Sequence, residues 1–253
     1  MKRLILAALT LLLPTIVIAS SGEVKLQKAN IDISDKAALQ AGAKLFVNYC
    51  MGCHSANYVR FERMGNDLGL TKEELQENLM FTAEKVGEMM NIGMKGTDSI
   101  NWFGVVPPDL SVIARARGVD WLYTYLLSFY LDPTRPLGVN NLVFKDVGMP
   151  HILWDRQGWQ QPVYEQVMDA QGNTHEVIAH LELVDKDKMT EPEYQEKVDN
   201  YRQDVRNLVS FLDYIGEPAK LQRQGLGWKV ILFLIIFSIV AYLLKHEYWR
   251  DVH

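Results

Sequence analysis

The feature that most constrains this chain is the placement of its cysteines. Its 253 residues contain only two, Cys50 and Cys53, and the residue after them is His54. So few cysteines exclude a disulfide framework. The pattern C-x-x-C-H is the attachment signature of c-type haem, because two thiols one helical turn apart can each add to a vinyl group of one porphyrin. The sequence therefore predicts one covalent haem c, with His54 as the axial ligand beneath the iron.

Two other chemistries use paired cysteines. A thioredoxin-like redox pair expects a strand–helix–strand context, which is missing around Cys50. A zinc site needs two further ligands at matching spacing, and the lone His151 supplies one at most. Haem attachment is therefore the preferred interpretation.

The N-terminus is typical of an exported protein. Lys2 and Arg3 precede an apolar run from Leu4 to Ile18, and the small residue Ala19 follows. A charged start, an apolar stretch and a small residue are the pattern of a secretory signal peptide. The alternative is an anchor that is not cleaved. In both cases the chain after residue 19 is exported, which suits covalent haem attachment.

A second apolar segment lies near the C-terminus. No charge interrupts Val230–Leu244, and Trp228, Lys229, Lys245 and Trp249 flank it. Such flanks extend a short apolar helix to the roughly 30 Å of a bilayer core, because aromatic rings and lysines settle at the interface. The alternative is a buried helix of a soluble protein. The expected organisation is a signal peptide (1–19), an exported cytochrome c-type haem domain (20–224), a transmembrane anchor (225–246) and a cytoplasmic tail (247–253).

Composition excludes other classes of protein. The net charge is -5, and 23% of residues are charged while 48% are hydrophobic. The absence of a basic surplus argues against nucleic-acid binding. A mean hydropathy of -0.07 is too low for a polytopic membrane protein.

The segment between the two ends is mainly helical by its pattern of caps and apolar positions. The fold class expected is a mainly α, cytochrome c-like haem domain with long loops and a small β-hairpin, plus one C-terminal transmembrane helix. Helices are predicted over 35–49, from the capping box at 71–74 to about 91, from Asp109 to Gly118, over 120–131, and from the capping box at 190–193 to 216. A long loop is predicted over 132–160 and a hairpin over 163–183.

The residues alone leave the second axial ligand open. Met149 lies in the long loop between Gly148 and Pro150, where its thioether can cross the face of the haem. His151 is the main competitor. The other methionines near predicted helices suit core packing better, and two more histidines lie in the hairpin. These residues are Met80, Met89, Met90, Met94, His175 and His180.

Three segments together resemble cytochrome c1, the haem subunit of the bacterial ubiquinol–cytochrome c reductase (cytochrome bc1) complex. They are CMGCHSANYVRF at the haem motif, VVPPDLSVIARARGVDWLY at 105–123 and VGMPHIL at 147–153, followed by the C-terminal anchor. The resemblance covers essentially the whole mature chain. The serine and alanine after His54, and the histidine at position 151, depart mildly from the family pattern.

The resemblance implies a set of cofactor-binding residues. His54 and Met149 are the implied axial ligands of the iron. Arg117 would meet a haem propionate, Pro108 would line the haem pocket, and Trp121 would lie near a propionate. The alternative for Arg117 and Trp121 is an ordinary role at the helix surface and in the core.

The resemblance also implies the function. The chain would pass electrons from a Rieske iron–sulfur protein through its haem to a cytochrome c, beside a cytochrome b subunit and membrane lipid. It would act as a redox subunit that is not catalytic alone, on the periplasmic side of a bacterial inner membrane. The alternatives are a membrane-anchored monohaem cytochrome c of another respiratory complex and a haem-based sensor with an open axial position.

Overall fold

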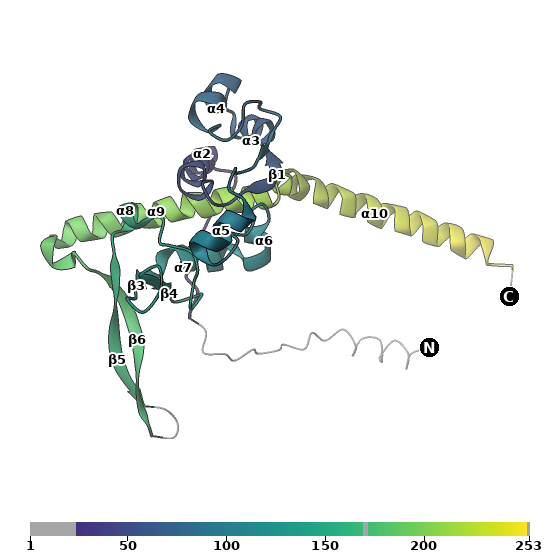
Figure 1. Cartoon of the computed structure of the whole chain (residues 1–253). Coiled ribbons are helices and arrows are strands. Elements are labelled where there is room, and N and C mark those ends of the chain that lie inside the picture. Colours follow the sequence, from purple (N-terminus) through teal and green to yellow (C-terminus); the bar gives the residue numbers. More distant parts are fainter. Residues whose placement is uncertain (1–23, 169–171, 252–253) are drawn as a thin grey trace.

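The computed structural model describes residues 24–168 and 172–251, so the expected signal peptide lies outside the described residues. The helices are α2 (Lys36–Leu45), α3 (Phe61–Leu68), α4 (Lys72–Asn78), α5 (Gly96–Phe103), α6 (Ile113–Arg117), α7 (Val119–Leu127), α8 (Trp154–Gln157), α9 (Glu191–Gly216) and α10 (Lys220–Tyr248). Three antiparallel strand pairs accompany them: β1 (Ala56–Arg60) with β2 (Met89–Met90), β3 (Phe129–Leu131) with β4 (Val139–Asn141), and β5 (Gln160–Met168) with β6 (Thr174–Leu183). In Figure 1 the short elements gather around α9, α10 runs away from them, and the β5–β6 hairpin extends to one side.

The core forms where α2 lies against α9. Asp35 caps α2 by accepting hydrogen bonds from the backbone N–H groups of Ala37 and Ala38. A Cβ at Gly42 would lie 2.0 Å from the carbonyl oxygen of Asn207, so only glycine allows the two helices to approach this closely. The contact also buries apolar side chains, and it fixes the helix that leads into the cysteines.

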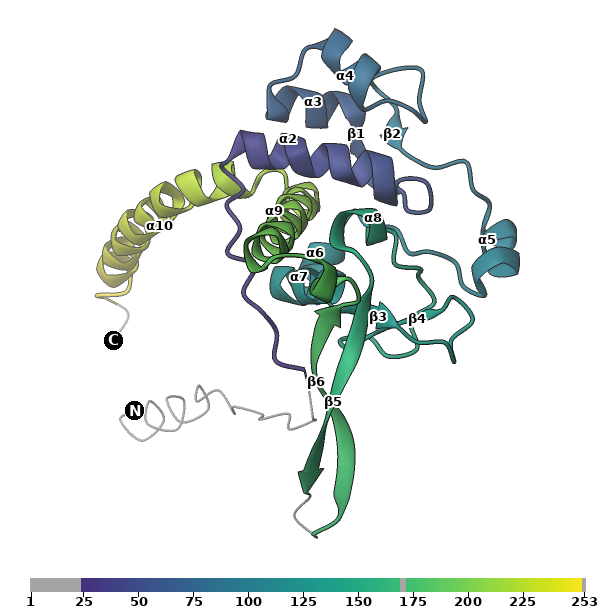
Figure 2. The ribbon, with the colours of Figure 1, turned by 90° about the vertical axis from the view of Figure 1, so that its left-hand side faces the viewer.

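The opposite side of α9 is covered by α6 and α7, as Figure 2 shows. Tyr201 of α9 is buried and donates a hydrogen bond to the backbone oxygen of Leu126 in α7, at 2.7 Å. Tyr123 of α7 accepts one from Arg206, at 3.1 Å. The long helix α9 therefore packs against α2 on one side and against α6 and α7 on the other.

The β5–β6 hairpin confirms the predicted turn between two alternating segments. Its pairing runs from Gln160 opposite Leu183 to Met168 opposite Thr174, with one irregularity after Val163. At its base, the side-chain amide of Gln160 donates to the backbone oxygens of residues 127 and 129. These hydrogen bonds anchor the base of the hairpin to the segment that joins α7 to β3.

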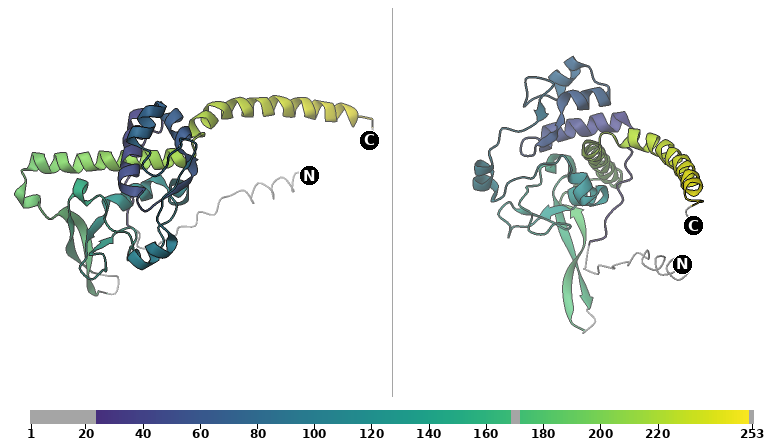
Figure 3. Two further views of the ribbon diagram at one scale, coloured as in Figure 1. Left: turned by 45° about the horizontal axis from the view of Figure 1, so that its top comes forward. Right: turned by 90° about the vertical axis from the view of Figure 1, so that its right-hand side faces the viewer.

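The C-terminal helix α10 confirms the prediction of one apolar helix that fits a membrane span. It has 29 residues, about 43 Å at 1.5 Å per residue, and its side chains are exposed along its length. Its length and composition suffice to cross a membrane. Figure 3 shows α10 leaving the domain from the end of α9, and Lys220 binds Asp213 at 2.7 Å across that junction.

Several predicted helices end earlier than expected. The capping box at Thr71 is confirmed, but α4 ends at Asn78, and Met89 and Met90 lie in a strand beside the haem motif. Likewise α7 ends at Leu127, and the residues that follow form β3. In both cases strand pairing overrides the local helical pattern.

Two smaller predictions were also wrong. Asp109 does not start the helix that ends before Gly118; its carboxylate accepts hydrogen bonds from the backbone N–H groups of Asn57 and Ser111, and α6 begins only at Ile113. The predicted loop over 132–160 contains β4 and α8. Asp109 therefore ties two segments together and leaves the helix uncapped by its side chain.

Candidate functional site

The cysteine motif forms a tight helical turn at the end of α2. A π-helical turn, Phe46–Cys50, continues α2, and the backbone oxygen of Cys50 then accepts hydrogen bonds from the N–H groups of Cys53 (3.0 Å) and His54 (2.9 Å). The two thiols are therefore one turn apart, as the motif predicts. Both are free, Cys50 buried and Cys53 half-buried.

The electrostatics of the thiols differ from those of a redox pair. Burial raises the pKa of the Cys50 thiol to about 12, with a smaller contribution from Cys53. Burial also raises the pKa of Cys53. A thioredoxin-like pair needs a lowered thiol pKa, because the thiolate is its nucleophile. Neutral, buried thiols at this turn suit covalent attachment better than disulfide exchange.

His54 has one ring nitrogen committed and one free for a metal. Its Nδ1 lies 2.7 Å from the backbone oxygen of Pro108. A carbonyl oxygen can only accept, so the proton is on Nδ1 and Nε2 is the unprotonated nitrogen. Burial lowers the pKa of His54, which keeps the ring neutral. Pro108, predicted to line the pocket, thus also orients the ligand through its backbone.

The methionine loop meets the same segment that orients His54. Gly148 packs on Val105, three residues before Pro108, and a Cβ at Gly148 would lie 3.1 Å from a Val105 methyl group. The close approach brings Met149 beside the segment 103–108. The two predicted axial ligands are therefore brought to one region, although 95 positions separate them in the sequence.

Met149 rests on a small apolar cluster separate from the main core. This cluster consists of buried Phe129, Val139 and Val147 at the β3–β4 pair. On another side, the hydroxyl of Tyr125 donates a hydrogen bond to the Met149 sulfur at 3.4 Å. The thioether is thus held by side chains, whereas a backbone carbonyl holds the imidazole of His54.

His151, the competing ligand, is enclosed by aromatic rings. It is 4% exposed, stacks on Phe129 with ring centroids 5.0 Å apart, and meets the edge of Trp159 at 5.9 Å. Burial lowers its pKa to about 4, so the ring is neutral at pH 7. The ring is thus packed against Phe129, whereas Met149 is only partly buried. The other candidate histidines, at positions 175 and 180, are exposed on the hairpin.

Arg117 and Trp121 form one face beside Met149. The Arg117 guanidinium lies 5.1 Å from the ring centre of Trp121 and 6.0 Å from that of Phe144. Trp121 stacks on Tyr125 at 5.0 Å, which joins this face to the methionine. Arg117 is exposed and keeps its planar donors available for a carboxylate. The other arginine of the triplet, Arg115, packs along Gly216 at the end of α9.

The residues around the motif fit a haem. A hollow of about 180 Å³ begins at Cys53 and continues along the segment 92–109. Val106 lines this hollow and is 54% exposed, and Trp102 is 63% exposed on α5, the helix whose Gly96 and Ser99 also line it. A soluble domain rarely leaves such side chains grouped on its surface unless something covers them. The two thiols can bond to the vinyl groups of a haem, and the imidazole and the thioether can bind its iron. The apolar side chains can contact the ring, and the guanidinium can pair with a propionate.

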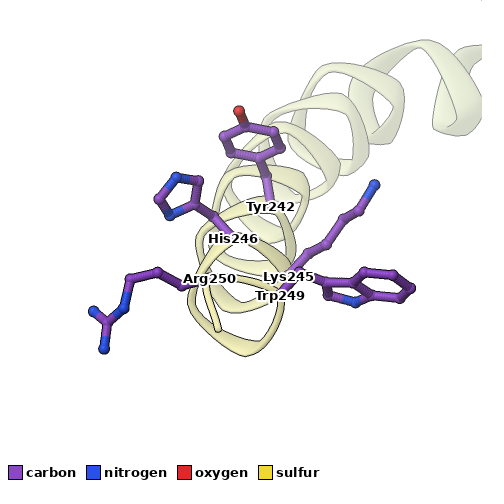
Figure 4. A pocket seen from close by; sticks show the side chains of 5 residues that line it. All are labelled: Tyr242, Lys245, His246, Trp249 and Arg250. Atoms are coloured by element: carbon purple, nitrogen blue, oxygen red, sulfur yellow. The ribbon is translucent and has the colours of Figure 1, made fainter. Parts of the chain in front are cut away.

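A second hollow lies at the far end of α10 and has a different character. Figure 4 shows its side chains spreading outward from the last turns of one helix. They combine aromatic and basic types, as is typical of residues at a membrane interface. The residues are Tyr242, Lys245, His246, Trp249 and Arg250. Figure 1 places this end of α10 far from the haem motif.

Sequence reasoning missed three contacts of the site. It did not foresee the Tyr125 hydroxyl on Met149, the Gly148–Val105 contact, or the hydrogen bond that Tyr49 donates to Asp155 at 2.8 Å. Each joins segments more than 20 residues apart. The only available signal was the glycine directly before Met149.

Comparison with known proteins places these features in a family. A sequence model described as the Cytochrome C1 family matches residues 27–252. The chain is 48% identical to cytochrome c1 of Allochromatium vinosum over 253 residues, which is all of both chains. It is 45% identical to the ammonia monooxygenase gamma subunit of Nitrosomonas europaea over 254 residues, covering 100% of this chain and 98% of the relative. Cytochrome c1 of Rhodospirillum rubrum is 26% identical, covering 86% of this chain and 83% of the relative.

Proposed function

Because this chain belongs to the cytochrome c1 family, we propose that Cys50 and Cys53 hold its haem and that His54 and Met149 are the axial ligands. As a family member, the chain is the haem-bearing electron-transfer subunit of the cytochrome bc1 complex and carries one covalent haem c. The bound haem supplies reversible one-electron chemistry at its iron. The other expected functions, a lone membrane-anchored cytochrome and a haem sensor, are not favoured.

The chain's own residues fix the site in complementary ways. The turn at Cys50 places the two cysteines one helical turn apart, and the Pro108 carbonyl keeps Nε2 of His54 free to bind. A thioether ligand from Met149 favours the ferrous state and so raises the reduction potential. Arg117 is placed to pair with a propionate, where a planar guanidinium binds a carboxylate through two donors. Trp121 holds that guanidinium over its ring.

The proposed partners follow from membership of the complex. A Rieske iron–sulfur subunit would deliver the electron, a cytochrome c would remove it, and a cytochrome b subunit would flank the anchor in the lipid. We place the haem domain (20–224) on the periplasmic side of a bacterial inner membrane, after removal of residues 1–19. The span 225–246 would anchor it, with the tail 247–253 in the cytoplasm. The apolar, exposed surface of α10 supports the anchor.

Acidic residues are concentrated between positions 182 and 199, where their charge could attract a basic cytochrome c. They are Glu182, Asp185, Asp187, Glu191, Glu193, Glu196 and Asp199. Glu182 is paired with Lys186 at 2.5 Å, and Asp185 with Lys188 at 2.7 Å. These pairs cancel part of the negative field that would steer a basic cytochrome. The exposed apolar side chain of Val106 is closer to the haem motif, since Val106 and Cys53 line the same hollow.

One observation carries the proposal: the segment 103–108 touches both the imidazole of His54 and the loop of Met149. The test is purification from native membranes in mild detergent. We expect haem that stays attached to this chain on denaturation, together with a cytochrome b and an iron–sulfur subunit. Isolation of the chain as a lone cytochrome would contradict the proposed partners. Loss of the haem on denaturation would contradict attachment at the two cysteines.

A further inference from the structure

The Tyr125 hydroxyl makes an unusual contact for a residue in an apolar layer. It lies 3.4 Å from the sulfur of Met149, and a thioether sulfur carries no hydrogen, so the hydroxyl is the donor. A tyrosine hydroxyl is protonated near neutral pH, so it is able to donate. The contact therefore has a fixed direction, from oxygen to sulfur.

The ring that carries this hydroxyl has little freedom to move. Trp121 stacks on it with centroids 5.0 Å apart and planes 8° apart, and Phe129 meets it edge-on at 5.1 Å. The backbone oxygen of Tyr125 also accepts a hydrogen bond from the side chain of Asn141 at 2.8 Å. The donor is therefore held in place before any ligand binds.

Packing alone does not explain a tyrosine here. Its neighbours Trp121 and Phe129 present ring faces and edges, against which phenylalanine would pack equally well. Placing a hydroxyl in such a layer costs free energy unless it forms a hydrogen bond. The sulfur of Met149 provides the partner that offsets this cost.

We propose that Tyr125 is a positioning residue that raises the reduction potential of the haem by donating a hydrogen bond to the axial sulfur of Met149. The inference rests on the proposed ligation by Met149. A thioether sulfur has two lone pairs, one for the iron and one for the hydroxyl. The hydrogen bond withdraws electron density from the sulfur and weakens its donation to iron. Ferric iron depends on that donation more than ferrous iron, so the ferrous state is favoured.

The test is a redox titration of the haem in the purified complex carrying Tyr125→Phe. We expect a three- to fivefold shift of the equilibrium toward ferric haem. That shift is a fall of about 30 to 40 mV in potential, at 59 mV per tenfold for one electron. The far-red absorption band of ferric haem, which reports the methionine–iron bond, is expected to persist at a shifted wavelength.

A matched control is Tyr201→Phe. Its hydroxyl also binds α7, at the backbone oxygen of Leu126, and Tyr201 is not among the residues packed with Met149. We expect the potential of this variant to equal that of the wild type. An equal fall in both variants would mean that loosening of α7 changes the potential, and would overturn the role of the hydroxyl.

A second measurement covers the case in which the variant does not assemble. Ring-monofluorinated tyrosine placed at position 125 has a more acidic hydroxyl, donates a stronger hydrogen bond, and is expected to raise the potential. If wild-type protein lacks the far-red band, ligation by Met149 is wrong and this inference falls with it. If the band is present and neither change at position 125 moves the potential, only the inference about Tyr125 is wrong.

Discussion

The two predicted ligands of the iron are held by contrasting means. His54 follows a helical turn that grows out of α2, which packs on the longest helix of the domain, and a backbone carbonyl sets its tautomer. Met149 lies in a loop whose support comes from apolar side chains and one hydroxyl. Changes to side chains near Met149 should therefore alter the ligation and potential of the iron, whereas changes near His54 should act mainly through folding.

The largest effect should come from Gly42, where α2 touches α9. Gly42→Val places carbon 2.0 Å from the Asn207 backbone oxygen, which cannot yield cheaply. We expect a loss of more than 4 kcal/mol in stability and little haem-bearing protein. The measurement is the amount of covalent haem in membranes. The control is Gly93→Ala, where a Cβ meets nothing within 4 Å; an equal loss there would contradict the helix contact as the cause.

Substitutions at two buried phenylalanines test the His54 side and the Met149 side of the site separately. Phe129→Ala and Phe211→Ala each remove a ring that is 0–1% exposed, and each should cost about 3–5 kcal/mol. Phe129 lies under Met149, whereas Phe211 packs on Phe46 at the α2–α9 contact. Among folded molecules, only the Phe129 variant should lose the far-red band of ferric haem. Loss of the band in both variants would remove the distinction between the two sides.

A smaller effect is expected at Gly148. Gly148→Ala puts a methyl group 3.1 Å from a Val105 methyl, which should displace the loop and cost about 1–2 kcal/mol. Val105→Ala in the same chain should restore most of the loss, because the two residues share one contact. Thermal unfolding of the two single variants and the double variant measures this. Strictly additive losses would show that the contact does not set the loop position.

The smallest effect concerns the N-terminal segment that crosses α7. Asp120 accepts hydrogen bonds from Lys28 and from the N–H of Ala29, and the Lys28 bond is the larger cause of its lowered pKa. Since the folded pKa lies below the unfolded value near 3.9, this stability is present above about pH 4 and lost below it. Asp120→Asn should lower the free energy of unfolding by under about 1 kcal/mol at pH 7. It should also make this free energy depend less on pH below about pH 4. An unchanged slope below pH 4 would contradict this.

The sequence predicted the parts of the fold that local chemistry determines. The capping boxes at Thr71 and Thr190, the hairpin and the apolar helix α10 each depend on neighbouring residues. The attachment turn is equally local, since Cys50, Cys53 and His54 are almost adjacent. These elements could be read without knowing what they pack against.

The parts that were missed depend on distant contacts. Met89 and Met90 leave the predicted helix because they pair with residues 56–60, and Asp109 gives up a capping role to bind Asn57. The hydrophobic periodicity of a segment does not predict which distant segment it will pair with. The hydroxyl of Tyr125 on Met149 belongs to the same class, because it joins residues 24 positions apart on either side of the β3–β4 pair.

The far-red band of the ferric protein reports whether the iron is bound between His54 and Met149, as we claim. We expect Met149→Leu to abolish this band while the haem stays covalently attached. Met94→Leu is the control, because Met94 also lines the hollow at Cys53. A band that survives loss of Met149, or disappears with loss of Met94, would contradict the claim.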